Sequence, residues 1–443
     1  DEGNAGDNTV FRALRDYVST HDLAVSANYS YVQARFDMDD FILYQLCEIY
    51  FANIDWPQNN TRVWRRRLSA TDLTQPHGLD GRWRCLLFDV DLGAGHPWSA
   101  GYTEDTLAVA LSPTDRSGFD NPWATAFLRA LIRNPDFKRD FLNTAADLLN
   151  SSFLPARAVA LVNAMEAELR PAMGEHLRRW RSCGGIVSTW QERVQVLRSF
   201  AQNRASRMRQ HCVSALAPTG TVQITVNVTD PAIDRIRVNR LTVDSNLPGA
   251  GATPYPWRGT YFCDAAITLE AIPGPGRRFV GWTGLATTNR VAIVKLTNVL
   301  SITANFEAAS QDWTALVLTE LHYHPASSDG VTDDAFEFLE LQNTGIAALD
   351  LTGLAFTRGI AFAFTNGATL APGAFLVLAQ DPFQLPARFP GIEAHGRYTG
   401  RLDNAGETLT LRYPGASTVF ELTYDDERPW PALADGGGMS LQR

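Results

Sequence analysis

The chain has 443 residues and a formal net charge of -9. Chains of this length do not usually fold around a single hydrophobic core, so two to three domains are expected. The negative charge argues against a nucleic-acid partner, because phosphate binding needs a basic surface. No apolar run is long enough to span a membrane.

The N-terminal half is expected to be mainly helical. Apolar residues recur at helical spacing within residues 1–35, and the almost continuously apolar run 41–52 predicts a central buried helix. Residues 93–122 are rich in Gly, Ser and Pro, so an irregular segment is expected there. Helical periodicity then continues over residues 123–212.

Two polar loops follow regular elements in this half. The first comes directly after the apolar run and reads Asn53-Ile54-Asp55-Trp56-Pro57-Gln58-Asn59-Asn60. The second follows an expected hairpin of strands 61–68 and 82–88 and reads Phe88-Asp89-Val90-Asp91-Leu92-Gly93. Rigid elements commonly present catalytic groups in such loops.

The spacing within the loops indicates phosphoryl-transfer chemistry. A carboxylate followed five residues later by an amide is the arrangement of a kinase catalytic loop, where the Asp accepts the substrate hydroxyl proton and the Asn holds Mg²⁺. Asp55 would be the base and Asn60 a metal ligand. Asp89 would be the principal metal ligand, and Asp91 would contact a second ion or orient Asp89.

The same residues also fit a structural interpretation. Asp and Asn commonly cap backbone amides in turns, and a lone Asp-x-x-x-x-Asn is more often a turn than a catalytic loop. The second loop at the appropriate place favours the kinase interpretation for Asp55 and Asn60. Asp91 is left open between a metal contact and a structural cap.

Lysine usage limits the kinase interpretation. A kinase uses a lysine upstream of the catalytic loop to grip the nucleotide phosphates. The chain has only Lys138 and Lys295, and neither precedes Asp55. We therefore expect either that the nucleotide-binding lobe is missing or that the site is inert. The chain begins at Asp1 rather than Met, as a piece of something longer would, so the lack of a visible signal peptide carries little weight.

Residues 1–212 resemble the CotH kinases, named after spore-coat protein H. The resemblance implies a kinase-like C-lobe that phosphorylates Ser or Thr with ATP and Mg²⁺ or Mn²⁺. It also implies Asp55 as the catalytic Asp and Asn60 and Asp89 as metal ligands. Phe88 stands where the family usually has Trp. Besides the two loops, the resemblance rests on Asp37-Met38-Asp39-Asp40-Phe41, Leu131-Ile132-Arg133-Asn134-Pro135-Asp136-Phe137 and Trp190-Gln191-Glu192-Arg193.

After a Pro-containing linker at 213–218, the periodicity changes from helical to alternating. Residues 219–308 are expected to form a small β domain, with strands at 221–228, 236–243, 266–272, 277–282, 291–296 and 300–306. Its motifs are Gly259-Thr260-Tyr261-Phe262, Arg277-Arg278-Phe279-Val280-Gly281-Trp282 and Ile302-Thr303-Ala304-Asn305-Phe306. With these motifs the domain resembles the internalin-type β-repeats of bacterial surface proteins. Phe279 and Trp282 are expected to anchor its core rather than to form an exposed binding pair.

Residues 313–443 are expected to form another all-β unit. Its motifs are Glu320-Leu321-His322-Tyr323-His324-Pro325, Phe338-Leu339-Glu340-Leu341-Gln342-Asn343 and Leu349-Asp350-Leu351-Thr352-Gly353-Leu354. With these motifs the unit resembles a lamin-tail domain, an immunoglobulin-like β-sandwich. Glu320, His322 and His324 alternate along one strand and so share a face. A half-exposed strand face is favoured over a metal site for these three residues.

The five cysteines fit no zinc spacing. Cys47 and Cys85 lie in apolar runs and are expected to be buried. A disulfide between Cys183 and Cys212 is compatible with the sequence but is not required by it.

This order of modules is that of long secreted or cell-surface bacterial proteins. The sequence therefore predicts a secreted or cell-surface CotH-type protein kinase with a protein substrate. The alternative is a non-catalytic adhesion or scaffold protein, in which the kinase-like domain is inert and the partner belongs to the cell envelope.

Overall fold

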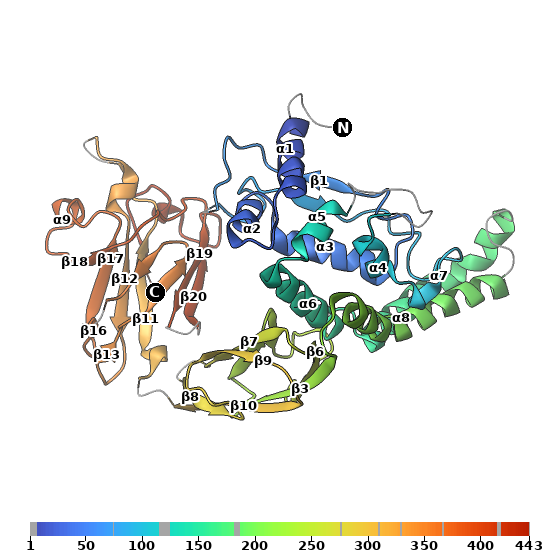
Figure 1. Cartoon of the computed structure of the whole chain (residues 1–443). Helices are drawn as coiled ribbons and strands as arrows, with labels where there is room; N and C mark the ends of the chain where they lie inside the picture. Colours follow the sequence, from blue (N-terminus) through green and yellow to red (C-terminus); the bar gives the residue numbers. More distant parts are fainter. Residues whose placement is uncertain are drawn as a thin grey trace. The chain divides into compact units, whose positions relative to one another are not determined.

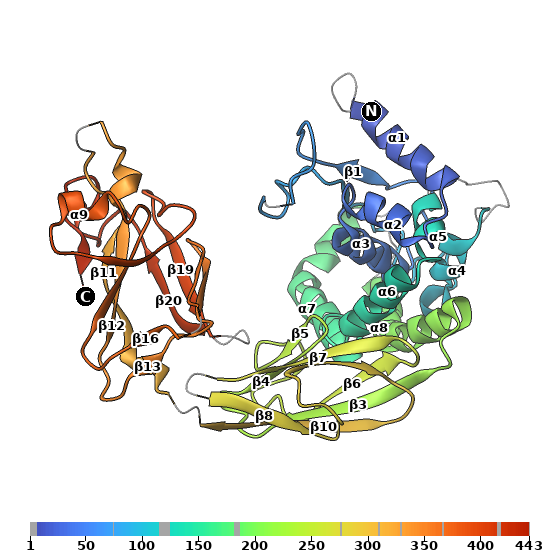
Figure 2. The same cartoon turned by 60° about the vertical axis from the view of Figure 1, so that its left-hand side comes forward.

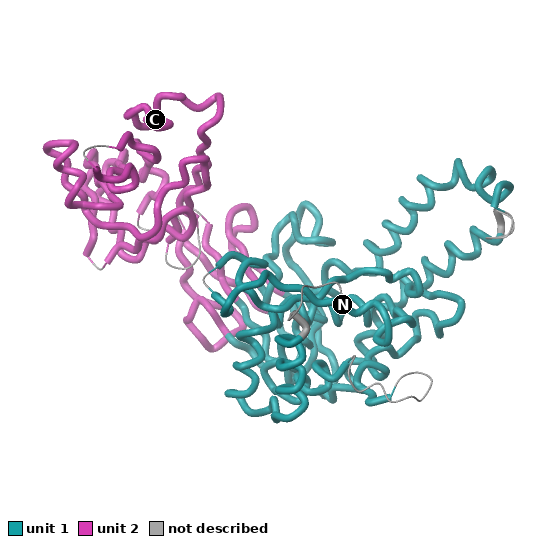
Figure 3. The backbone as a smooth tube through the Cα atoms, turned by 90° about the horizontal axis from the view of Figure 1, so that it is seen from above, with its two compact units in different colours: residues 1–225, 238–269, 293–301 teal, residues 226–237, 270–292, 302–443 magenta. Residues whose placement is uncertain are grey.

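The chain is helical in its N-terminal region and is built from β-sheets in the remainder, as the sequence predicts (Figure 1). It folds into two compact units, shown in different colours in Figure 3. Unit 1 comprises residues 1–225, 238–269 and 293–301, and unit 2 comprises 226–237, 270–292 and 302–443. The computed structural model describes residues 7–73, 75–114, 125–180, 187–274, 277–308, 311–327, 330–365, 367–413 and 418–442.

The expected helices are confirmed over the described residues. Residues 93–122 were expected to be irregular, but they contain α4 because the Asp105 carboxylate accepts a hydrogen bond from the Ala108 N–H and Leu107 is buried. The last helix runs into the expected linker and ends at Leu216. The helices are α1 Asp7–Thr20, α2 Ser26–Gln33, α3 Met38–Phe51, α4 Thr106–Leu111, α5 Ala126–Leu131, α6 Pro135–Leu149, α7 Pro155–Arg179 and α8 Val187–Leu216, with a 3-10 turn η1 Gly101–Thr103.

Helix α3 is the central buried helix that the apolar run predicts. Its N-terminus is capped by Asp37, whose side chain accepts a hydrogen bond from the Asp40 N–H at 3.3 Å. At its C-terminus, Ala52 adopts a left-handed conformation with φ of 54°. The chain therefore leaves the helix sharply at the start of the first polar loop.

The expected hairpin is present but short. Strands β1 (Arg62–Trp64) and β2 (Arg84–Leu86) pair antiparallel, and the Asp40 carboxylate accepts a hydrogen bond from the Cys85 N–H at 2.6 Å. Arg84 is buried and donates to Asp37 and to Asp80, each at 2.8 Å. These contacts fix the hairpin to the start of α3.

The following β domain contains two four-stranded sheets. Their strand orders are β6-β3-β10-β8 and β5-β4-β7-β9. The expected strand 236–243 is two strands, because the chain turns at Asn239 with φ of 48°. Strand β6 was not predicted. The strands are β3 Thr221–Val228, β4 Arg235–Val238, β5 Leu241–Val243, β6 Trp257–Phe262, β7 Ala266–Ile272, β8 Arg277–Thr283, β9 Val291–Lys295 and β10 Leu300–Ala308.

Within unit 1, a polar row on α6 meets β6 and β7. Asn143, Asp147 and Asn150 follow helical spacing, and all three are buried. The Asn150 side chain accepts from the Thr260 N–H at 2.9 Å and donates to the Thr260 carbonyl at 3.0 Å. Asp147 accepts from the Tyr261 hydroxyl at 2.9 Å. The helix thereby supplies partners to an outer strand of the sheet.

The C-terminal part is a two-layer β-sandwich with one shared hydrophobic core (Figure 1, Figure 2). Its main sheets have the orders β18-β17-β12-β11-β21 and β15-β14-β19-β20, and β13 pairs with β16. This arrangement confirms the expected β-sandwich. The elements are β11 Leu316–His322, β12 Phe338–Asn343, β13 Leu349–Asp350, β14 Ala355–Arg358, β15 Phe362–Ala363, β16 Thr369–Leu370, β17 Phe375–Ala379, α9 Leu385–Arg388, β18 Ala394–Arg397, β19 Glu407–Arg412, β20 Thr418–Tyr424 and β21 Leu441–Gln442, with 3-10 turns η3 Trp313–Ala315, η4 Asp333–Phe336 and η5 Ala432–Ala434.

Among the helices in the described ranges, none is both long enough and apolar enough to cross a membrane.

Candidate functional site

The structure brings the two predicted loops together. The amide nitrogen Nδ2 of Asn60 donates to Oδ2 of Asp55 at 3.2 Å and to the backbone carbonyl of Asp89 at 3.0 Å. Nδ2 of Asn59 donates to Oδ1 of Asp55 at 2.7 Å. Both oxygens of the Asp55 carboxylate are therefore held, and the second loop is fixed beside them.

Asn53 forms hydrogen bonds with both of these loops. Its side-chain Oδ1 accepts a hydrogen bond from the Asp55 N–H at 3.1 Å. Its Nδ2 donates to the Asp89 carbonyl at 3.2 Å and to Oε2 of Glu48 at 3.0 Å. Asn53 and Glu48 are both fully buried. The position of Asp55 is thus set by a buried side chain anchored on α3.

The backbone of both loops uses conformations that their residue types tolerate. Asn60 and Asp89 have φ of 58° and 56°, in the left-handed region that Asn and Asp enter more readily than most residues. Gly93 is needed for close packing, because a Cβ there would lie 2.8 Å from the Phe51 carbonyl oxygen. The same carbonyl accepts from the Ala94 N–H. The second loop therefore returns directly against the end of α3.

Glu48 is a buried acid beneath the loops. Burial raises its pKa to about 7, while the hydrogen bond from Asn53 acts in the opposite direction. The neighbouring Tyr44 hydroxyl donates to the Asn60 carbonyl at 3.0 Å. Among the described residues, Oε1 of Glu48 has no hydrogen-bond partner. A neutral Glu48 is therefore the form that suits the folded state.

Replacing Glu48 with Gln is expected to flatten the pH dependence of stability. The folded pKa of Glu48, about 7, lies above the ordinary value of 4.5. The folded state therefore binds more protons between these values, and Glu48 costs stability as pH rises through this window. In urea denaturation at pH 5 and pH 8, the free energy of unfolding of Glu48→Gln should exceed that of the wild type by roughly 3 kcal/mol at pH 8. Glu192→Gln, at an exposed position of α8, is the control. If the free energy of unfolding changes between pH 5 and pH 8 by the same amount in Glu48→Gln as in the wild type, the raised pKa of Glu48 is contradicted.

Asp89 and Asp91 form an exposed acidic pair in the second loop. The pKa of Asp89 is raised by a hydrogen bond with the Asp91 carboxyl, by the negative charge of Asp91 and, to a smaller extent, by Asp55. A divalent cation would relieve this repulsion, and Mg²⁺ prefers oxygen ligands. Both amide hydrogen bonds of Asn60 come from Nδ2, which leaves Oδ1 as the atom for a cation.

The described residues alone do not provide a complete metal cage. In the part of the chain that the structure describes, no group of three or more His, Cys, Asp or Glu side chains is arranged to hold a metal ion. Two carboxylates and one amide fit the kinase pattern, in which substrate phosphates and water supply the remaining ligands. The residues present thus fit Mg²⁺ bound together with a nucleotide.

Arg204 of α8 holds the end of α3 that leads into the first loop. Its side chain is fully buried, and burial lowers its pKa to about 10. The guanidinium donates to the carbonyls of Ile49 and Tyr50 in α3, at 2.7 Å for Tyr50. It also donates to the carbonyls of Tyr102 and Glu104, at 2.9 Å and 2.7 Å. One side chain therefore supplies a donor to the Tyr50 carbonyl at the end of α3 and links this helix end to the segment around Tyr102.

Comparison with protein-family models identifies the three regions of the chain. Residues 1–208 match the CotH kinase protein model. These residues form a CotH kinase domain. Residues 243–310 match the divergent InlB B-repeat domain, and residues 309–426 match the Lamin Tail Domain. The resemblances predicted from the motifs are confirmed.

The search of curated proteins found no match. Among solved structures, a crystal structure of a DUF4876 family protein from Bacteroides thetaiotaomicron matches with 14% sequence identity and a TM-score of 0.19. The match covers 44% of this chain and 67% of that one.

Three residues that support the CotH loops were not predicted from the sequence as functional. Glu48 had a visible signal, because it is the only charged residue in the apolar run 41–51. Asn53 stands in the quoted motif, but nothing in the sequence indicates that it bridges both loops. Arg204 lies 149 residues after Asp55 in an ordinary helical pattern, so no local signal could have found it.

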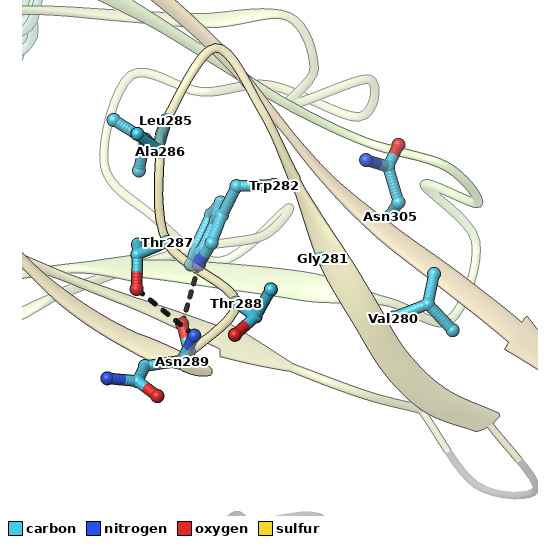
Figure 4. A pocket seen from close by; sticks show the side chains of 9 residues that line it. All are labelled: Val280, Gly281, Trp282, Leu285, Ala286, Thr287, Thr288, Asn289 and Asn305. Atoms are coloured by element: carbon cyan, nitrogen blue, oxygen red, sulfur yellow. Dashed lines mark hydrogen bonds between the residues drawn. The ribbon is translucent and has the colours of Figure 1, made fainter.

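In the InlB B-repeat, Trp282 is an anchor, as expected. It is buried, its ring lies 5.2 Å from that of Phe279, and its Nε1 donates to the Asn289 carbonyl at 2.8 Å. Figure 4 shows this bond among the side chains that line a hollow. The hollow has a volume of about 590 Å³. The hollow is lined by Val280, Gly281, Trp282, Leu285, Ala286, Thr287, Thr288, Asn289 and Asn305.

In the lamin tail domain, Glu320, His322 and His324 do not converge. His322 is buried rather than half-exposed, because its ring packs against Phe338 and Phe389. Burial lowers its pKa to about 4. His324 instead pairs with Asp435 at 2.5 Å, and Glu320 accepts from the Ser440 hydroxyl. The three side chains thus have separate partners.

Two of the cysteine expectations need correction. Cys47 and Cys85 are half-buried rather than buried. For Cys85 the reason is that β1 and β2 form only a two-stranded sheet. Cys212 is buried and free, while Cys183 lies outside the described residues.

Proposed function

We propose that the CotH kinase domain transfers the γ-phosphoryl group of ATP to Ser or Thr hydroxyls of a protein, in a secreted or cell-surface bacterial protein. The observation that supports this proposal most directly is the position of Asn60, whose amide contacts both the Asp55 carboxylate and the Asp89 loop. A solitary turn would not need to bring a second acidic loop to the same amide.

Each residue of the site has a distinct role in the proposed reaction. The Asp55 carboxylate accepts the proton of the substrate hydroxyl. At the same time the hydroxyl oxygen bonds to the γ-phosphorus, and the bond from that phosphorus to ADP breaks. Asn60, Asp89 and Asp91 would hold Mg²⁺ or Mn²⁺. The cation supplies charge neutralisation for the phosphates when it is bound. Asn53 and Glu48 orient the two loops.

A second candidate function rests on the lysines. The nucleotide-gripping lysine of kinases has no counterpart before Asp55. Lys138 lies in α6, and Lys295 in β9 pairs with Asp264 at 3.3 Å. If no other part of the protein supplies this group, the domain is a non-catalytic scaffold in an adhesion protein with a cell-envelope partner.

Nucleotide-dependent stabilisation distinguishes the two candidates. Adding ATP and Mg²⁺ to the chain is expected to raise the melting temperature of unit 1, because a ligand that binds only the native state stabilises it. A gain of 1 kcal/mol should give a rise of about 2–4 °C in scanning calorimetry. Asp89→Ala should remove the rise, while Asp16→Ala, at an exposed position of α1, should keep it.

The opposite results are equally informative. A rise of the same size in Asp89→Ala would contradict the metal assignment. No rise in the wild type with ATP and either Mg²⁺ or Mn²⁺ would favour the scaffold.

A further inference from the structure

Arg62 stands beside both loops of the candidate site. It is the second residue after Asn60, and it begins β1, where it lies opposite Leu86 of β2. The central carbon of its guanidinium group lies 4.8 Å from the centre of the Phe88 ring. Phe88 directly precedes Asp89, whose carbonyl accepts a hydrogen bond from the Asn60 side chain at 3.0 Å. The strand that follows the first loop therefore holds the Arg62 side chain next to the second loop.

Arg62 is exposed, and it has no carboxylate partner among the residues that the structure describes. By contrast, Arg82 and Arg84 of the same hairpin both pair with Asp80, at 2.7 Å and 2.8 Å. A guanidinium that lies over an aromatic ring keeps the N–H groups at its edge available as donors. Within the described structure, Arg62 thus presents a positive charge whose donors are not used by an acidic side chain.

A nucleotide at this site would bring several negative charges close to those of the protein. Asp55, Asp89 and Asp91 already place three carboxylates in the two loops. Protein kinases use a lysine to neutralise part of the phosphate charge, and no lysine precedes Asp55 in this chain. A guanidinium serves the same purpose, because its planar fork of N–H groups matches the oxygens of a phosphate. Arg62 therefore has the charge, the donors and the position that such a contact needs.

We propose that Arg62 binds the phosphates of ATP and takes the place of the lysine that other kinases use. This inference rests on the proposed function, because it requires a nucleotide beside Asp55. Arg62 donates charge-assisted hydrogen bonds to phosphate oxygens, while Asn60 and Asp89 hold the cation. The Phe88 ring keeps the guanidinium in place when no nucleotide is bound. Loss of Arg62 should then weaken ATP binding itself, before any phosphate is transferred.

The test is the binding of ATP and Mg²⁺ to the full chain, measured by isothermal titration calorimetry without a protein acceptor. Arg62→Met should weaken binding roughly tenfold or more, because it keeps an apolar chain over Phe88 but removes the charge and the donors. Arg62→Lys should retain part of the affinity, since Lys keeps the charge without the planar fork. The matched control is Arg66→Met, because Arg66 is also exposed but lies beyond the end of β1.

The dependence of binding on salt distinguishes a phosphate contact from a structural role of Arg62. Salt screens the attraction between an exposed guanidinium and a phosphate. Raising the NaCl concentration should therefore weaken ATP binding more steeply in the wild type and in Arg66→Met than in Arg62→Met. Weaker binding by Arg62→Met with the same salt dependence as the wild type would overturn the phosphate assignment.

The remaining outcomes separate this inference from the proposed function. Equal ATP binding by the wild type and Arg62→Met would exclude Arg62 as the phosphate contact and leave the kinase proposal intact. No binding of ATP by the wild type with either Mg²⁺ or Mn²⁺ would overturn both. A normal melting temperature of Arg62→Met without nucleotide shows that the variant is folded. If that variant melts early, Arg62→Gln replaces it with the same expected result, because Gln keeps a polar side chain at this exposed position.

Discussion

Asp55→Asn is expected to lower phosphotransfer by about 10²–10⁴-fold, the usual contribution of a general base. The Asn side chain keeps one oxygen that can accept a hydrogen bond, but it cannot take the proton from a substrate hydroxyl. In the native site, Oδ1 of Asp55 accepts from Asn59 and Oδ2 accepts from Asn60. The measurement is transfer of labelled phosphate from ATP to a mixed protein acceptor.

The matched variant Asp16→Asn changes the same functional group at an exposed position of α1 and should keep the wild-type rate. Asp55→Asn should also retain the stabilisation by ATP and Mg²⁺, because Asp55 is not assigned to the metal. A variant that binds nucleotide and turns over at the wild-type rate would exclude Asp55 as the base. Loss of both binding and turnover would instead indicate that the loop had collapsed.

Arg204→Met is expected to destabilise unit 1 by on the order of 3 kcal/mol. The substitution keeps an apolar chain of similar length but removes the guanidinium that donates to the carbonyls of Tyr50 and Tyr102, whereas the Ile49 carbonyl keeps the Ala52 N–H as a donor. Each buried carbonyl left unpaired costs about 1–3 kcal/mol. Part of this cost is offset, because burying a guanidinium is itself unfavourable.

The control for this prediction is Arg207→Met, which changes an exposed Arg on the same helix. Urea denaturation followed by circular dichroism should show a lower midpoint only for Arg204→Met. Equal midpoints for the two variants would show that the carbonyls find other partners. A loss of phosphotransfer in Arg204→Met under conditions where it remains folded would show that the end of α3 also positions Asp55.

The sequence predicted those parts of the molecule that depend on local pattern. The apolar run identified α3, and the short polar strings after regular elements identified the loops of Asp55 and Asp89. Strand β6 was missed because Trp257–Phe262 contains a glycine and lacks strict alternation. Its residues instead depend on partners in α6, more than 100 positions away.

The sequence also could not predict the hydrogen bonds by which distant residues hold the two loops and the end of α3 in place. Asn53 acquires its role only when the Asp89 loop lies beside it, and Arg204 only when α8 packs on α3. In both cases the hydrogen bonds to the distant segments join a side chain to backbone carbonyls, which every residue possesses. No pattern of residue types could therefore specify these partners. The lamin tail motifs were more informative because they cover a whole domain.

The bond pattern between Asn150 and Thr260 has a consequence for how this protein can be divided. Thr260 belongs to the InlB B-repeat, yet its N–H and carbonyl are both satisfied by a side chain of the CotH kinase domain. Cutting the chain after α8 would leave three buried polar side chains of α6 facing water and would expose an edge of β6. The repeat is thus not an interchangeable spacer. Its first strands would have to be inherited, exchanged and expressed together with the kinase domain.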